Sequence, residues 1–393
     1  MTIDLPISKS IANRLLILQA IHGDGLLTVS ADMPDDVLLL HHALSLIASF
    51  TEDSATSMRR SGGNKIRVDE DKINLDFVSE ASRSLTISLG NCGTAMRFLT
   101  AYSAQLEGQT TILDGVARMH HRPIGQLVDA LRSIGADIEY LGEEGFPPLR
   151  IKGCILDTNR IVTIDNPQST QFVSALLLIG ANVQTNSTSP YITLTREMIR
   201  NKEQGTKNKD KLVTTDQTEV TSLGSLFLTP YSEIERDWSA AAFWYEYVAL
   251  HGGEITLPGL FRDSLQGDKV VADIFSHLGV ETQYTREGIQ ISCCQAILNS
   301  KFLIQNFKDC PDLYPAVALT CERLGITLHA TGVESLPLKE SDRLRAVAEH
   351  RTDADHRMAM ALMIAGYEVD DTACISKSYP QFLQHFRRIS PRL

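Results

Sequence analysis

The stretch LVDALRSIGADIEYLGEEGFPPLRI, residues Leu127–Ile151, is repeated in outline by VADIFSHLGVETQYTREGIQI, residues Val271–Ile291. In each copy a helical pattern ends at a glycine, Gly135 or Gly279, and two strand-like runs follow with a turn between them. Glycine suits a helix end because, lacking a Cβ, it readily adopts the left-handed conformation that closes many helices. The matching offsets indicate a true internal repeat, whose unit is helix, strand, turn, strand.

A weaker third copy begins with the helical pattern of Asp36–Phe50 and continues with the strand-like runs Lys65–Asp69 and Lys72–Val78. Two polar stretches, Glu52–Asn64 and Arg200–Thr218, interrupt the pattern, and we expect them to form surface loops or exposed hairpins.

Composition narrows the class of protein. The chain has 393 residues, 43% hydrophobic and 22% charged, which indicates a soluble globular protein with more than one domain. A net charge of −11 disfavours nucleic acid as a partner. The first residues form no signal peptide, and no apolar stretch is long enough to span a membrane. The seven cysteines are irregularly spaced and include no C-x-x-C pair, so we expect free thiols in the cytoplasm and no zinc site.

Three segments of the first third place basic residues at predicted helix starts: SKSIANR (Ser8–Arg14), GNCGTAMR (Gly90–Arg97) and RMHHRPIG (Arg118–Gly125). We expect the first helix to begin near Ser10, capped by that hydroxyl. Helix starts attract anions because their N–H groups are unpaired and the helix dipole is positive there. The paired histidines of the third segment have no further ligand at suitable spacing, so a metal site is not expected.

The rest of the chain adds segments of the same kind. Asn166–Phe172 offers uncharged hydrogen-bonding side chains before an apolar helix, which suit a hydroxylated or phosphorylated ligand. In the last third, Asp312, the cluster Lys339–Arg343 and the segment Asp355–Met360 each precede an apolar helix. A charge cluster usually forms a solvated face. Basic residues at helix starts oppose the dipole, however, and this arrangement indicates an anionic ligand that compensates.

The placement of charge favours an anion-binding cavity. Although the chain is acidic overall, basic residues collect in these few segments: Lys9, Arg14, Arg97, Arg122, Lys339, Arg343, Arg357 and Lys377. If they converge, they form a cationic pocket that contains two carboxylates, Asp312 and Glu340. Such a pocket suits small, multiply anionic substrates, and its carboxylates suit general acid or base chemistry.

The ordered motifs resemble those of the 5-enolpyruvylshikimate-3-phosphate synthases, within the enolpyruvyl transferases. The matching pieces are SKSIANR, GNCGTAMR, RMHHRPIG, STQF, SPY, SLQGD, PD, KESDR, DHRMAM and KSYP, which together extend from Pro6 to Pro380. The resemblance implies an α/β fold (α+β in detail), a two-domain inside-out barrel of repeated βαβαββ units. It also implies a central domain at 8–234 and a discontinuous second domain at 1–7 and 235–393.

The resemblance further implies transfer of the enolpyruvyl group of phosphoenolpyruvate to the 5-hydroxyl of shikimate 3-phosphate, a step of aromatic amino-acid biosynthesis. Shikimate 3-phosphate would contact Lys9, Ser10, Arg14, Ser169, Thr170, Gln171, Thr188, Tyr191, Asp312, Ser335 and Lys339. Phosphoenolpyruvate would contact Lys9, Gly93, Arg122, Arg343, Arg357 and Lys377. No cofactor, metal, membrane or nucleic acid is implied, only small anionic substrates and a monomeric cytoplasmic enzyme.

The catalytic roles are implied in the same way. Asp312 would take the proton of the 5-hydroxyl while that oxygen attacks C2 of phosphoenolpyruvate. Glu340 and Lys9 are candidates for proton transfer to C3, and Lys377 would assist the departure of phosphate. Arginine suits the binding of these substrates because its planar fork pairs with carboxylate and phosphate through two hydrogen bonds.

Two alternatives remain. UDP-N-acetylglucosamine enolpyruvyl transferase is similar in fold and reaction, but it uses a cysteine in the loop equivalent to Arg118–Gly125, which has none here. A weakly active or inactive anion-binding relative is the other alternative. The retained Asp312 and Glu340 argue against it, because a pure binder has no need of those carboxylates.

The last repeat is predicted to be truncated. A helix, a turn and two strands should follow Arg343, yet Arg357 follows after only 14 positions. A helix of about ten residues leaves no room for a hairpin there. We therefore expect one sheet of the second domain to lack its hairpin and to present an unpaired edge.

Overall fold

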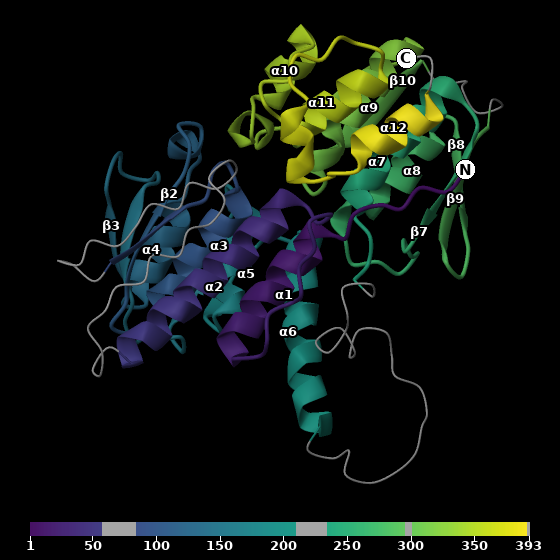
Figure 1. Cartoon of the computed structure of the whole chain (residues 1–393). Helices are drawn as coiled ribbons and strands as arrows, with labels where there is room; N and C mark the ends of the chain where they lie inside the picture. The colour runs from purple at the N-terminus through teal and green to yellow at the C-terminus, as the bar shows by residue number, and fades with distance from the viewer. Residues whose placement is uncertain (57–83, 210–233, 295–300, 391–393) are drawn as a thin grey trace.

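The computed structural model describes residues 1–56, 84–209, 234–294 and 301–390. Figure 1 shows two halves joined near the N-terminal segment, each with its strands on the outer side and its helices within. β2 and β3 flank the first half, and β7, β8 and β9 flank the second. The predicted inside-out arrangement, with helices inside and sheets outside, is confirmed.

The described segments contain helices of very different length. They are α1 (Lys9–His22), α2 (Asp35–Thr56), α3 (Gly93–Ala104), α4 (Gly125–Ser133), α5 (Thr170–Leu178), α6 (Pro190–Lys209), α7 (Trp238–His251), α8 (Val271–Ser276), α9 (Tyr314–Leu324), α10 (Arg343–Glu349), α11 (His356–Ile364) and α12 (Phe382–Ile389). Short 3-10 helices lie at Met119–His121, Gly267–Val270, Pro311–Leu313, Leu336–Leu338 and Ala373–Lys377.

The strands form small separate sheets. They are β1 (Ser84–Ser88), β2 (Thr110–Asp114), β3 (Asp137–Tyr140), β4 (Leu149–Lys152), β5 (Ile161–Thr163), β6 (Asn182–Gln184), β7 (Glu254–Pro258), β8 (Val280–Tyr284), β9 (Gly288–Cys293), β10 (Phe302–Asn306) and β11 (Thr327–Thr331). Their orders are β1-β2-β4-β3, β5-β6, β7-β9-β8 and β10-β11. β1 is parallel to β2, whereas the hairpin β3–β4 joins β2 through an antiparallel β4.

The internal repeat is confirmed. α4 leads into the hairpin β3–β4, and α8 leads into the hairpin β8–β9. Gly135 and Gly279 follow the two helices with φ of 104° and 83°, in the region that disfavours any residue with a Cβ. In the weaker third copy the helix is present as α2, and both strand-like runs lie outside the described residues.

The truncation of the last repeat is also confirmed. α10 ends at Glu349 and α11 begins at His356, and the described residues between them contain no strand. The sheet of this unit, as far as the structure describes it, consists of β10 and β11, which are parallel.

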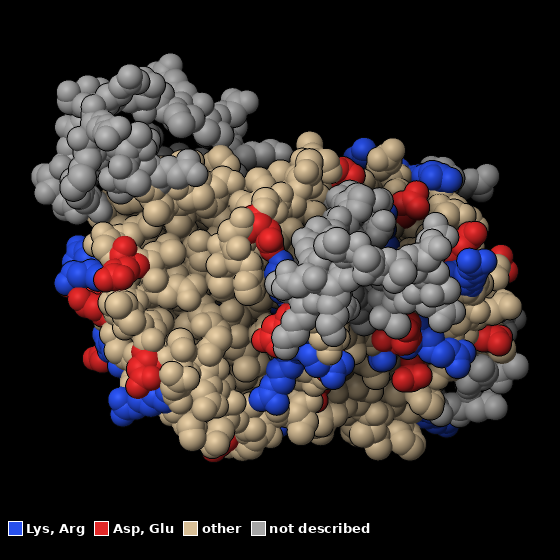
Figure 2. Space-filling model, turned by 90° about the horizontal axis from the view of Figure 1, so that it is seen from below, with Lys and Arg blue, Asp and Glu red and all other residues tan. Residues whose placement is uncertain are grey.

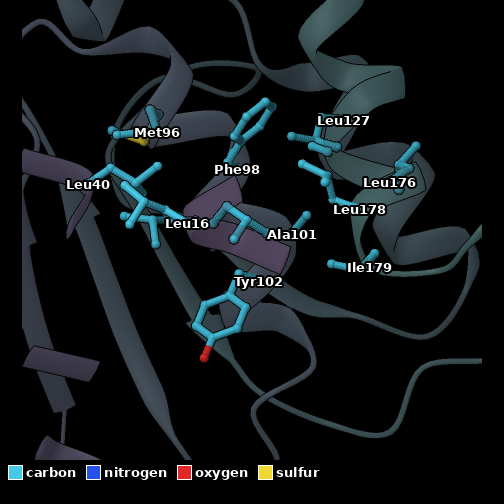
Figure 3. Packing of buried hydrophobic residues seen from close by; sticks show 14 of the residues in the cluster. Leu16, Leu40, Met96, Phe98, Ala101, Tyr102, Leu127, Leu176, Leu178 and Ile179 are labelled. Carbon is cyan, nitrogen blue, oxygen red and sulfur yellow. The ribbon is translucent and has the colours of Figure 1, made fainter. Parts of the chain in front are cut away.

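The buried apolar residues form two clusters. One extends from Ile7 to Ile234 along the chain, and the other combines Ile3 and Leu5 with residues after Trp238. Figure 3 shows part of the first cluster, in which Phe98 of α3 lies between side chains of the flanking helices. Backbone bonds from Ser8 N to Glu235 O (2.9 Å) and from Asp237 N to Pro6 O (3.0 Å) bring the two crossing segments side by side.

Two sequence expectations need correction. Residues 200–209 continue α6 and do not form a loop, because they are rich in good helix formers and contain no proline. Ser8, and not Ser10, caps α1, since its hydroxyl accepts a hydrogen bond from Ile11 N. The remainder of both polar stretches, 57–64 and 210–218, lies outside the described residues.

The surface carries charges of both signs. Figure 2 shows acidic and basic side chains interspersed over the described part of one face. Among helices of the described segments, none has both the length and the apolar composition of a bilayer-spanning segment.

Glu246 is a buried carboxyl group in the middle of α7. Its side chain is 0% exposed, and neither carboxyl oxygen has a hydrogen-bond partner among the described residues. Burial raises its pKa well above the ordinary value of 4.5, so the folded protein holds it protonated. The unfolded chain releases this proton above pH 4.5, so the group lowers stability increasingly as pH rises toward the folded pKa.

We therefore predict that Glu246→Met stabilises the protein by about 1–3 kcal/mol, because an unpaired buried polar group is removed. The gain should grow as pH rises from 5 to 8, measured by urea unfolding at each pH. Glu281→Met, at an exposed site on β8, is the matched control and should show no such trend. A gain for Glu246→Met that shrinks with rising pH would contradict the assignment.

Candidate active site

A cavity of about 580 Å³ opens between the two halves. Most side chains predicted for the site line it: Lys9, Ser10, Arg14, Gly93, Arg122, Ser169, Thr170, Gln171, Tyr191, Asp312, Ser335, Lys339, Glu340 and Arg357. These come from both halves of the chain and from many separate segments. The basic residues therefore converge, as the sequence predicts.

The start of α1 places the N-terminal part of the site. Because Ser8 caps this helix, Lys9 and Ser10 stand in its first turn and face the cavity. Lys9 Nζ pairs with Asp36 Oδ2 at 3.0 Å. Arg14 is buried, its Nε donates to Thr195 Oγ1 at 2.7 Å, and burial lowers its pKa to about 10.

At the start of α3, the backbone of a glycine lines the cavity. Gly93 is the first residue of this helix, and a Cβ there would lie 2.5 Å from Arg122 Nη2 and would also clash with Arg97. Only glycine fits without moving these two guanidinium groups. Arg122 Nη1 donates to the carbonyl of Asn91 at 2.9 Å, which holds its guanidinium beside the start of the helix.

Asp312 precedes α9 and is surrounded by cations. Its carboxylate accepts hydrogen bonds from Arg357 Nη2 (2.8 Å), Arg343 Nη1 (2.7 Å) and Lys339 Nζ (3.3 Å). Burial by itself would raise the pKa of Asp312, but Arg357, Lys339 and Arg343 outweigh burial and hold it well below the ordinary range.

Glu340 is the second carboxylate of the cavity. It pairs with Lys377 Nζ at 3.0 Å and with Arg343 Nη2 at 3.0 Å, and Arg122 Nη2 lies 3.9 Å away. Burial acts to raise its pKa, yet Lys377, Arg122 and Arg343 together hold it well below the ordinary range. Both carboxylates are therefore ionised at neutral pH.

Arg343 connects these two groups from behind the cavity wall. Its side chain is 1% exposed, and it also pairs with Asp355, from Nε to Oδ2 at 2.8 Å. Burial opposes its charge, but Asp355, Asp312 and Glu340 more than offset burial and raise its pKa. This charge is stable inside the protein only because carboxylates surround it.

Comparison with known proteins decides the family. The family model of EPSP synthase (3-phosphoshikimate 1-carboxyvinyltransferase) matches residues 1–351 and 347–386. This chain belongs to the EPSP synthase family. The two matched parts overlap at residues 347–351, at the end of α10, just before the place where the hairpin is missing.

Relatives and solved structures agree with membership in the EPSP synthase family. A 3-phosphoshikimate 1-carboxyvinyltransferase of Bacteroides fragilis is 35% identical, over 98% of this chain and 94% of the relative. One from Idiomarina loihiensis is 30% identical, over 99% and 96%. The fold is similar to that of an EPSP synthase from Acinetobacter baumannii, with a TM-score of 0.59 and 18% identity over 99% and 95% of the two chains.

Three of the residues predicted for the site of this chain do not line the cavity. Thr188 lines a separate hollow beside Ser264 and Gln266, whereas its neighbours Ser187 and Ser189 line the cavity itself. Arg343 and Lys377 are not among the lining residues either, although each is bonded to a carboxylate that does line the cavity. Arg343 is 1% exposed, whereas the Lys377 side chain is 14% exposed.

The structure adds two residues that were not assigned to the site from the sequence, His356 and Asp355. His356 lines the cavity, and neither ring nitrogen has a hydrogen-bond partner among the described residues. Burial and then the charges of Lys9, Arg357 and Lys377 lower the pKa of His356 well below 6.5, so the ring is neutral. The side chain of Asp355 accepts from Arg357 N at 2.9 Å and so caps α11. An aspartate directly before an apolar helix was the available signal for that residue.

No group of three or more His, Cys, Asp or Glu side chains arranged as metal ligands occurs within the described residues. His120, the first of the two adjacent histidines, hydrogen-bonds Asp114 at 2.7 Å.

We predict that Asp355→Asn destabilises the protein by roughly 3–5 kcal/mol, because it leaves the buried Arg343 with less compensating charge while keeping a helix cap. Asp353→Asn is the matched control, since Asp353 pairs with Arg351 at the surface and should cost less than about 1 kcal/mol. Urea unfolding at pH 7 measures both. If both variants lose the same free energy of unfolding, the buried Arg343–Asp355 pair stabilises the protein no more than a surface ion pair does.

Proposed function

We propose that this protein transfers the enolpyruvyl group of phosphoenolpyruvate to the 5-hydroxyl of shikimate 3-phosphate and releases phosphate. The observation that carries the proposal is the cavity itself, in which cations from many segments surround two ionised carboxylates. Two multiply anionic substrates need this excess of positive charge, and the transfer of a proton needs the carboxylates. The names of the relatives describe the same reaction.

The side chains that line the cavity can be assigned to the two substrates. Shikimate 3-phosphate would be bound by Lys9, Ser10, Arg14, Ser169, Thr170, Gln171, Tyr191, Ser335 and Lys339. Phosphoenolpyruvate would be bound by Arg122, Arg357 and Lys9 with the backbone of Gly93, and by Arg343 and Lys377 beside them. Gln171 Nε2 donates to Thr94 Oγ1 at 2.8 Å, so the two proposed substrate positions adjoin at the start of α3.

Binding and chemistry are coupled through Asp312. While Arg343, Arg357 and Lys339 surround it, Asp312 is too weak a base to take a proton from an alcohol. Anions that draw these cations toward themselves raise the pKa of Asp312 and make it a better base. The carboxylate thus gains basicity when both substrates are in place, and it then accepts the proton of the 5-hydroxyl.

The other proton steps involve Glu340, Lys9 and Lys377. Glu340 and Lys9 are the candidates for protonating C3 of phosphoenolpyruvate. Glu340, which is ionised in the absence of substrates, must first take up a proton, and Lys377 is the donor bonded to it. Lys377 Nζ, bonded to Glu340 Oε1, carries the positive charge that favours departure of phosphate from the tetrahedral intermediate. The reaction draws much of its rate from two anions held in attack geometry in a preorganised cavity.

The proposed domains are 8–234 and 1–7 with 235–393. This division agrees with the two buried clusters and with the adjacent crossing segments. Because the cavity takes residues from both domains, we expect the substrates to draw the domains together. All proposed site residues belong to one chain, so a cytoplasmic monomer is a complete catalytic unit.

Specific observations weigh against the two alternatives. The sister enzyme would need a reactive cysteine in the loop 118–125, which has none. The nearby Cys92 is buried, and burial raises the pKa of its thiol to about 12, so it is an unsuitable nucleophile. An inactive relative is disfavoured because Arg343 and Arg357 still reach Asp312 despite the missing hairpin.

An assay of phosphate release tests the proposal. Purified protein with phosphoenolpyruvate should release phosphate when shikimate 3-phosphate is added, and not when UDP-N-acetylglucosamine is added. Release with the second acceptor alone would favour the sister reaction. No release with either acceptor, despite calorimetric binding of both anions, would favour the inactive relative.

We predict that Asp312→Asn lowers kcat by about 10²–10⁴, because the general base is lost. Affinity for phosphoenolpyruvate should stay the same or increase, since Arg343 and Arg357 no longer neutralise a carboxylate at this position. Steady-state kinetics and calorimetry measure the two effects separately. Weaker binding with kcat unchanged would assign Asp312 to binding alone.

We predict that Arg122→Lys raises the dissociation constant of phosphoenolpyruvate at least tenfold, because an ammonium cannot replace a fork that donates two hydrogen bonds. Arg118→Lys is the matched control in the same loop, since Arg118 donates to the carbonyls of Pro337 and Lys339 and does not line the cavity. Equal effects of the two substitutions on binding would remove Arg122 from the proposed site.

A further inference from the structure

β11 has a neighbouring strand on one side only. In its parallel pairing with β10, Thr327 N donates to Lys301 O at 3.0 Å, and Thr331 O accepts from Phe307 N at 2.8 Å. The odd-numbered residues of β11 therefore direct their backbone groups toward β10. Consecutive residues of a strand alternate in this respect, so the even-numbered residues direct their N–H and C=O groups to the opposite edge.

The opposite edge consists of Leu328 and Ala330. Within the described segments, the backbone N–H and C=O groups of these two residues have no hydrogen-bond partner. Unpaired strand edges of this kind are templates for another strand.

The intact repeat of the same chain reveals which structure belongs at this edge. β2 is parallel to β1, as β11 is parallel to β10, and each second strand follows one helix after the first. On the far side of β2 lies the antiparallel strand β4, which comes from the hairpin that the last repeat lacks. The edge of β11 is therefore built for an antiparallel partner that its own repeat does not provide.

We propose that a second copy of this chain provides that partner, through antiparallel pairing of β11 with β11 of the other copy. A twofold axis through His329 places Leu328 opposite Ala330 of the second copy, and Ala330 opposite its Leu328. These are the residues whose backbone groups point outward, so both pairs are hydrogen-bonded and His329 forms the pair between them. The resulting sheet, β10-β11-β11-β10, has four strands, as does β1-β2-β4-β3.

The side chains suit this self-pairing. On the inner face, the large Leu328 meets the small Ala330 of the other copy. FLIQN of β10 and TLHAT of β11 contain no charged residue and no proline, the devices by which natural edge strands avoid pairing. No like charges therefore meet when two identical strands approach, and a twofold contact requires such self-complementarity.

The outer face of this sheet is unusually apolar for a solvent-exposed surface. Phe302 and Ile304 are 57% and 67% exposed, and the ring of Phe302 lies edge-on to His329 with centroids 6.1 Å apart. Pairing about His329 would bring the two Phe302–His329 units into one row across the sheet. The association is expected to be reversible, because each chain already contains a complete set of proposed site residues.

Sedimentation velocity and hydrogen exchange on the full chain test the proposal. Between 1 and 200 µM, the sedimentation coefficient should rise from that of a monomer toward that of a dimer. The amides of Leu328 and Ala330 should exchange at least tenfold more slowly at the higher concentration. A monomer at every concentration overturns the proposal. So does full protection of both amides at 1 µM, since another part of the chain would then cover the edge.

A charge at the axis provides the sharper test. His329→Lys places two like charges opposite each other and should raise the dimer dissociation constant at least tenfold. The side chain is exposed and outside the cavity, so turnover should be unchanged. Ile155→Lys, at an apolar residue 80% exposed in the other half, is the matched control and should leave association unchanged. Association that survives His329→Lys, or that both substitutions weaken equally, overturns the proposal.

Discussion

The cavity depends on one buried positive charge, the guanidinium of Arg343. A charge out of contact with water is stable only when opposite charges surround it, and here Asp355, Asp312 and Glu340 do so. Arg343 in turn holds the two cavity carboxylates, Asp312 and Glu340, in position. Asp355 also caps α11. The Arg343–Asp355 pair therefore fixes the start of α11 relative to the two carboxylates of the cavity.

This arrangement explains how a site for two anions can exist before either anion arrives. The cations would repel one another if the two carboxylates did not lie between them, and the carboxylates would be costly to bury without the cations. Substrate anions can take over part of that pairing, which leaves the carboxylates freer to accept a proton. Affinity and basicity are then two consequences of one charge balance.

The repeat and the missing hairpin can be predicted from the residues, because glycine positions and the spacing of motifs are local signals. The family and the inside-out fold follow from the resemblance that the ordered motifs carry. Thr188 lines a neighbouring hollow, whereas Ser187 and Ser189 line the cavity, because a motif gives the position of a loop but not the direction of each side chain in it. Asp355 and His356 lie in a segment that the sequence singles out, but their places in the site depend on partners elsewhere in the fold: Asp355 pairs with the buried Arg343, and His356 lines the cavity. The helical extension of α6 was missed because polarity was read as a loop signal, although its residues favour a helix.

The most direct measurement is a crystal structure with shikimate 3-phosphate and phosphoenolpyruvate bound to the Asp312→Asn protein, read beside a wild-type structure without substrates. Without substrates, the account predicts the hydrogen bonds from Arg357 and Arg343 to Asp312, at 2.8 and 2.7 Å, seen here. With both substrates bound, Arg357 should instead contact phosphoenolpyruvate beside Arg122, with the 5-hydroxyl next to residue 312. Substrates bound outside this cavity, or an Arg357 that contacts neither anion, would contradict the account.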